Sequence, residues 1–90
     1  MDAKQAIHAA KVYVTDLFED EGARNVRLEE IDFEPHRETW SVTVSFARVS
    51  DSQSAFDLAL APSTKRSYKV VTISDRDNKV VSLKNREGME

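Results

Sequence analysis

The hydrophobic pattern of the chain changes once, from a helical period to a strand period. In residues 3–21, apolar side chains recur three and four positions apart, which is the spacing of one helix face. From about residue 25 onward, apolar and polar residues alternate, as they do in β-strands. The face of the predicted helix comprises Ala3, Ala6, Ile7, Ala10, Val14, Leu17 and Phe18. The sequence therefore predicts an α+β domain, with one N-terminal helix packed on a three- to four-stranded antiparallel curled sheet in an α-β-β-β-β meander.

Local signals mark both ends of the predicted helix. Asp2 followed by Gln5 fits a capping box, in which each side chain binds the backbone amide of the other residue. Gly22 is the expected stop, because glycine enters the left-handed conformation without a steric penalty.

The strand beginning at Trp40 has the most regular alternation in the chain. Trp40, Val42, Val44 and Phe46 fall on one side of WSVTVSFARV, so this strand is predicted to be central in the sheet. Trp40 should then pack beneath the helix, near Leu17 or Phe18.

The preceding strand, NVRLEEIDFE, changes register near Glu29 and Glu30. One interpretation is a β-bulge, which adds a residue and re-aims the strand. The other is that both faces of this strand are partly apolar. A polar turn at residues 35–38 follows it.

A hairpin closes the chain, with strands SYKVVTIS and VVSLKN joined by a turn over residues 75–79. Asn78 suits a left-handed position in that turn. Val71 and Ile73 are expected to face inward together with Val81 and Leu83, and the tail from Arg86 onward is predicted to be frayed.

Residues 50–66 are predicted to form a long, mobile connection within a single domain that spans residues 1–90. The segment is polar at both ends, and Pro62 ends any regular structure in it. Its apolar residues could extend a strand or contact a partner protein; they are Phe56, Leu58 and Leu60.

Size and composition narrow the classes of function. Ninety residues suffice for one core, and the net charge of −3 argues against a protein that binds nucleic acid through its phosphates. The absence of cysteine excludes disulfides and thiol chemistry. No apolar run approaches the about 20 residues of a membrane span, and the N-terminus does not resemble a signal peptide. These features predict a cytoplasmic protein with no membrane or nucleic-acid partner.

No residue pattern indicates catalysis, a cofactor or a metal. Asp75, Asp77 and Asn78 lack the further ligands and the glycine of a calcium loop. His8 and His36 stand alone, and the chain contains neither a glycine-rich phosphate loop nor a nucleophile elbow. The chain is therefore predicted not to be an enzyme.

Charge differs between the two predicted edge strands. The first strand is acidic, with Glu29, Glu30, Asp32 and Glu34, and the last is basic, with Lys79, Lys84 and Arg86. Charges on edge strands commonly prevent association between sheets, which predicts a monomer. Alternatively, an edge that includes Glu29 and Glu30 recognises a partner.

The segments VRLEEIDF, WSVTV and YKVVTISDRDNKVVSLK together resemble a PepSY-type domain, and the wider architecture is similar to the cystatin-like group. This resemblance implies a helix embraced by a curled antiparallel sheet. PepSY domains are usually extracytoplasmic, and some occur in peptidase propeptides, where inhibition has been suggested. This chain has Asn78 at the turn where the family usually has glycine.

Three functions follow as hypotheses. The first is a non-enzymatic module that binds an unknown protein through the long connection, a sheet edge or the outer sheet face. The second is a cytoplasmic inhibitor or regulator of a peptidase or other enzyme. The third is a small-molecule binder with a helix–sheet pocket lined by Tyr13, Trp40 and Tyr68.

Overall fold

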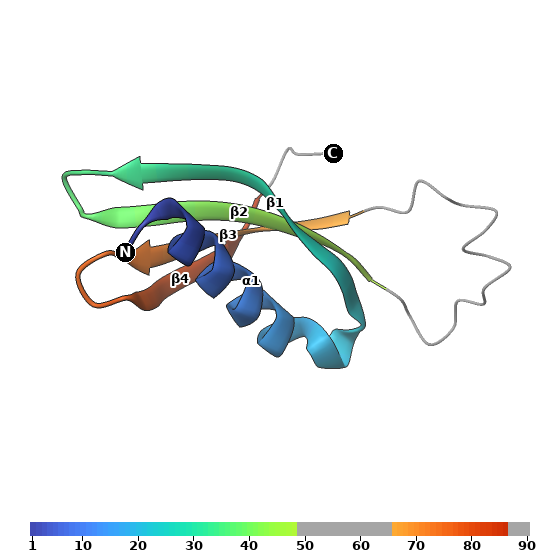
Figure 1. Cartoon of the computed structure of the whole chain (residues 1–90). Coiled ribbons are helices and arrows are strands. Elements are labelled where there is room, and N and C mark those ends of the chain that lie inside the picture. The colour runs from blue at the N-terminus through green and yellow to red at the C-terminus, as the bar shows by residue number, and fades with distance from the viewer. Residues whose placement is uncertain (49–65, 87–90) are drawn as a thin grey trace, which may run out of the picture.

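The computed structural model describes residues 1–48 and 66–86 (Figure 1). Its elements are α1 (Ala3–Phe18), the 3-10 turn η1 (Glu19–Glu21), β1 (Ala23–Glu34), β2 (Thr39–Arg48), β3 (Arg66–Ser74) and β4 (Lys79–Asn85). The four strands form one antiparallel sheet in the order β1-β2-β3-β4. This arrangement confirms the predicted α+β meander, with β2 in the interior of the sheet.

The helix begins at its predicted cap, but α1 ends at Phe18, before the predicted end at residue 21, and the 3-10 turn η1 continues to the predicted stop at Gly22. Asp2 Oδ1 accepts a hydrogen bond from the Gln5 amide at 2.8 Å, and Gln5 Oε1 accepts one from the Asp2 amide at 2.8 Å. After η1, Gly22 adopts a left-handed φ of 78° and donates its N–H to the carbonyl of Glu19. The left-handed glycine turns the chain out of the helix and into β1.

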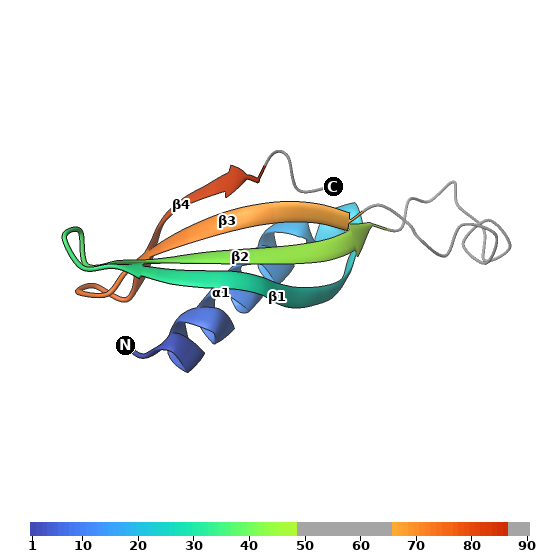
Figure 2. The same ribbon diagram turned by 90° about the horizontal axis from the view of Figure 1, so that it is seen from above.

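The core lies between α1 and one face of the sheet, which we call the inner face. Ala6, Ala10 and Val14 have no exposed surface on the helix. Their small side chains allow the helix axis to approach the sheet closely. The residues they cover are equally buried and are Val42, Val44, Phe46, Val71 and Ile73. Figures 1 and 2 show α1 on this one side of the sheet only.

A β-bulge in β1 confirms the predicted change of register. Leu28 pairs with Val44 and Glu30 pairs with Thr43, so Glu29 is the additional residue on β1. A second irregularity lies between Arg24 and Arg27, where Asn25 has a φ of 55°. The two apolar registers of the sequence therefore both face the helix.

A bulge in β4 overturns the predicted inward position of Val81. Ile73 pairs with Val80 and Thr72 with Ser82, which leaves Val81 unpaired and 63% exposed. Val80 packs against the core in its place. Both residues are valine, so hydrophobicity alone could not decide between them.

Trp40 lies at the opposite end of the helix from the predicted one. Its ring packs on Phe33 at a centroid distance of 4.8 Å, and its indole N–H donates to Asp75 Oδ1 at 3.0 Å. Phe46 instead stacks on Phe18 at 5.1 Å, and Leu17 is 48% exposed. The prediction for Trp40 was wrong because α1 runs so that its C-terminal end covers Phe46 and not the start of β2.

Part of the predicted connection at residues 50–66 lies outside the described residues. Phe56, Leu58 and Leu60 belong to that undescribed part. Arg66, which the prediction assigned to the connection, is instead the first residue of β3.

Candidate binding surface on the outer sheet face

The face of the sheet opposite α1, which we call the outer face, has small side chains along its centre. Alternation along β2 places Ser41, Thr43, Ser45 and Ala47 there. Longer side chains stand beside them on the neighbouring strands: Arg24 and Arg66 flank Ala47, and Arg27 and Tyr68 flank Ser45. No element in residues 1–48 and 66–86 covers this face (Figure 2).

One hydrogen-bond network centres on Ser45. Its hydroxyl donates to Glu29 Oε2 at 2.5 Å and accepts from Arg66 Nε at 2.9 Å. The same guanidinium donates through a terminal nitrogen to the carbonyl oxygens of Ser45, at 3.0 Å, and of Asn25. Arg27 Nε completes the network by donating to Glu29 Oε2 at 3.2 Å.

A second network links the two edges of the sheet across the outer face. Arg86 follows β4, and its backbone N–H donates to the Tyr68 carbonyl at 3.0 Å. Its guanidinium reaches Thr43 Oγ1 on β2 at 3.1 Å and Glu30 Oε1 on β1 at 2.6 Å. The acidic and basic edges that the sequence predicts are therefore joined to each other by an ion pair.

These long side chains bury the centre of a face on which no described helix lies. Ser45 has 0% exposed surface and Thr43 has 2%. Burying a hydroxyl costs free energy unless it is hydrogen-bonded, and both hydroxyls have partners. Arginine stems, through their methylene groups, provide the cover while the guanidinium groups stay near the surface.

The networks shift the ionisation of two groups. The hydrogen bond from Ser45, assisted by Arg27, lowers the pKa of Glu29 below its ordinary value. Partial burial, together with repulsion from Arg27, lowers the pKa of Arg66. Glu29 is thus held as a carboxylate, and a buried Ser45 bonded on both sides is not an accessible nucleophile. The arrangement suits binding through fixed charges.

A separate polar cluster lies at the end of the sheet where both hairpins turn. Asp75 Oδ1 accepts from the Trp40 indole and lies 3.5 Å from the amino nitrogen of Met1. The indole hydrogen bond, together with that ammonium, lowers the pKa of Asp75. The Asp75 amide donates to the Glu38 carbonyl at 2.8 Å, which ties the two turns together.

Sequence reasoning found part of the outer surface and missed the rest. Glu29 and Glu30 were predicted as contact residues, and the β1 bulge places both on the outer networks. Ser45 and Arg66 were missed. Arg86 was predicted as a charge of the basic edge and as the start of a frayed tail, and the second prediction was wrong, because its backbone and side chain are both hydrogen-bonded to the sheet. The signal that could have placed Arg66 and Arg86 on the outer face is strand alternation. Extending the predicted strand SYKVVTIS backwards by one residue puts Arg66 on the same face as Tyr68, and extending VVSLKN forwards by one residue puts Arg86 on the same face as Lys84.

Other kinds of site receive no support from the described chain. Residues 1–48 and 66–86 contain no group of three or more His, Asp or Glu side chains placed to hold a metal ion. Within the same ranges, no helix is long and apolar enough to cross a membrane. Comparison of the chain with protein-family models, curated proteins and solved structures gives no match.

Proposed function

We propose that this protein is a non-enzymatic binding module that contacts a partner protein through the outer face of its sheet. The observation that carries the proposal is the contrast in cover: α1 occupies the inner face, and no described element occupies the outer one. The charged side chains of the outer face are nevertheless fixed by hydrogen bonds. Fixed side chains lose little conformational freedom on binding, so such a surface is prepared for a partner.

The small-molecule hypothesis required a helix–sheet pocket lined by Tyr13, Trp40 and Tyr68, and these three side chains do not lie together. Trp40 pairs with Ile73, whose side chain is in the core, whereas Tyr68 pairs with Ser45 on the outer face. Trp40 and Tyr68 are therefore on opposite faces of the sheet and cannot line one cavity with Tyr13.

The inhibitor alternative depends on an apolar wedge at residues 56–60, which lie outside the described residues. Membership of the PepSY-like group likewise stays a prediction from the sequence pattern. The outer-face proposal rests on neither.

Photo-crosslinking tests which surface meets a partner. Lys84 pairs with Val70 on the outer face and is exposed, and Val12 on α1 is 45% exposed. A photoreactive amino acid is placed at either position, and the protein is irradiated in an extract of its source cells. We expect a discrete crosslinked protein from position 84 and none from position 12. Equal crosslinking from both positions, or crosslinking from position 12 alone, would contradict the proposal.

A further inference from the structure

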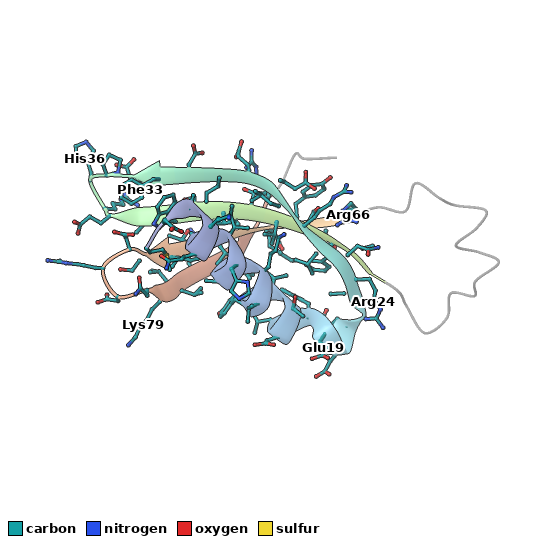
Figure 3. The ribbon with its side chains drawn as sticks, in the orientation of Figure 1. Glu19, Arg24, Phe33, His36, Arg66 and Lys79 are labelled. Atoms are coloured by element: carbon teal, nitrogen blue, oxygen red, sulfur yellow. The ribbon has the colours of Figure 1, made fainter. Side chains whose placement is uncertain are left out.

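The outer face carries an excess of positive charge at one end. The cations there are Arg24, Arg27, Arg66 and Arg86, which we call the arginine end. Figure 3 shows Arg24 and Arg66 at this end of the sheet, with His36 and Lys79 at the opposite end. Among residues 1–48 and 66–86, Glu29 and Glu30 are the acids that form ion pairs with these arginines, through Arg27 and Arg86.

Two of the four arginines are already neutralised. Arg27 pairs with Glu29 at 3.2 Å, and Arg86 pairs with Glu30 at 2.6 Å. Arg24 is exposed, and its guanidinium donates only to the carbonyl of Ala23, at 3.0 Å. The positive charge of Arg24 therefore has no carboxylate partner in the described part of the chain.

Within the described part of the chain, the hydrogen bonds of Arg66 go to neutral acceptors. Its hydrogen bonds go to the hydroxyl and carbonyl of Ser45 and to the carbonyl of Asn25. These bonds use Nε and one terminal nitrogen, so the N–H groups of the other terminal nitrogen have no partner among residues 1–48 and 66–86. Partial burial and the nearby Arg27 lower the pKa of Arg66. The Glu29 carboxylate acts in the opposite direction and raises the pKa of Arg66, as a further anion would.

Arg24 and Arg66 stand on either side of one small residue. Ala47 of β2 pairs with Arg24 on β1 and with Arg66 on β3. The two arginine backbones are thus two strand spacings apart, about 10 Å. Neighbouring acidic side chains of a short peptide span a comparable distance, and guanidinium groups bind carboxylates through paired hydrogen bonds.

We propose that the arginine end binds an acidic segment of the partner protein. Arg24 and Arg66 form the ion pairs with the carboxylates of that segment. This inference rests on the proposed function, because it names the chemistry of the partner that the outer face would meet. It goes further in assigning recognition to two residues at one end of that face.

The charge pattern favours a short acidic peptide over a nucleic acid. Towards its other end, the outer face turns negative through Asp32 and Glu34 on β1, which pair with Ser41 and Thr39. The net charge of the chain is −3. A long polyanion would run from the arginines into these carboxylates, whereas a segment of a few acidic residues ends before them.

The probe for this inference is a peptide of four glutamates flanked by glycines, titrated into isotopically labelled protein in about 20 mM salt. Amide chemical shifts then report where it binds. We expect shifts at Arg24, Ala47 and Arg66, and loss of binding when each glutamate is replaced by glutamine. Raising the salt to about 200 mM should weaken binding, because exposed ion pairs are screened.

A matched pair of charge reversals tests the residues. Arg24→Glu should weaken binding of the peptide by about fivefold or more, which is the loss of one good ion pair. Lys4→Glu makes the same charge change at an exposed position of α1, away from the arginine end. It should alter binding by less than about twofold. Arg24 is exposed, and its side-chain hydrogen bond among the described residues goes to the carbonyl of the adjacent Ala23, so the Arg24→Glu variant should keep the fold, which a melting curve checks.

Three results would overturn the inference: equal weakening by both variants, shifts away from the arginine end, or tighter binding of an oligothymidylate carrying the same number of charges. The third result would assign the surface to nucleic acid.

If the partner crosslinked through position 84 binds Arg24→Glu as well as the wild type, the outer-face proposal stands and the acidic-segment inference fails. If position 84 gives no crosslink while the peptide still binds at Arg24, the outer-face proposal fails and the affinity of the arginine end for acidic segments stands.

Discussion

The two faces of β2 are buried to the same extent by different means. Val42, Val44 and Phe46 point to the inner face and have 0% exposure beneath a helix. Thr43 and Ser45 point to the outer face and are 2% and 0% exposed. Within residues 1–48 and 66–86, long side chains of the neighbouring strands and of Arg86 cover them, and no helix does. Burial alone therefore does not distinguish a core from a surface network.

The difference lies in what stabilises each face. Apolar burial on the inner face is non-directional and grows with the area removed from water. The outer face depends on hydrogen bonds of defined geometry, and removing one partner leaves others unpaired. The inner face should therefore dominate the stability of the fold, and the outer face should fix the positions of its charges. The following changes test that division, from the largest expected effect to the smallest.

Phe46→Ala removes the largest fully buried side chain of the inner face, together with its stacking on Phe18. We expect a loss of about 3–5 kcal/mol in the free energy of unfolding, measured by urea denaturation. Val81→Ala, on a valine that is 63% exposed, is the control and should cost less than about 0.5 kcal/mol. Similar losses for the two variants would show that Phe46 is not in the core.

Ser45→Ala removes the hydroxyl that joins Glu29 to Arg66. We expect a loss of about 1–3 kcal/mol in the free energy of unfolding, because both charged groups lose a partner. Ser41→Ala is the matched control: it changes the same strand and face, but no side-chain hydrogen bond of Ser41 is found in the described chain. An equal response of the two serines would mean that the network on Ser45 contributes nothing to stability.

Trp40→Phe keeps a ring against Phe33 and removes the indole N–H that binds Asp75. The free energy of unfolding should fall by about 1 kcal/mol, the usual contribution of one hydrogen bond. The pKa of Asp75, followed by NMR, should rise towards its ordinary value, since the indole is the main cause of its lowering. An unchanged Asp75 titration would show that the indole does not act on this carboxylate.

The lowered pKa of Glu29 gives the smallest expected effect, a dependence of stability on acid. Its folded pKa lies below the ordinary value of 4.5, so the unfolded chain takes up a proton first as the pH falls. The contribution of Glu29 is therefore present above about pH 4.5 and is lost as the pH falls through its folded pKa. Glu29→Gln should show a smaller loss of unfolding free energy between pH 6 and pH 3 than the wild type, by about a few tenths of a kcal/mol.

Glu19→Gln is the control for this measurement, because it removes an exposed carboxylate outside the outer networks. It should leave the acid-dependent loss close to that of the wild type. If Glu29→Gln also retains the wild-type loss, the Ser45 hydrogen bond does not stabilise the carboxylate.

The sequence by itself determined the elements and much of their detail. The helix was predicted from its hydrophobic period, from the Asp2–Gln5 capping box and from Gly22. The regular alternation of β2 predicted that this strand lies in the interior of the sheet. The break in alternation near Glu29 and Glu30 indicated either a bulge or two partly apolar faces, and the structure has the bulge. Each of these features depends on residues within a few positions of one another, so the local pattern contains the information.

Only the tertiary structure decided which distant residues meet. Arg66 and Ser45 are 21 positions apart, and Arg86 and Glu30 are 56 positions apart. Their contacts depend on lateral strand register and on the path of long side chains across a sheet, which no local pattern specifies. The choice of Val80 over Val81 for the core was also decided by the tertiary structure. The two adjacent valines are identical in sequence terms, and only the pairing of β4 with β3 determines which of them faces inward.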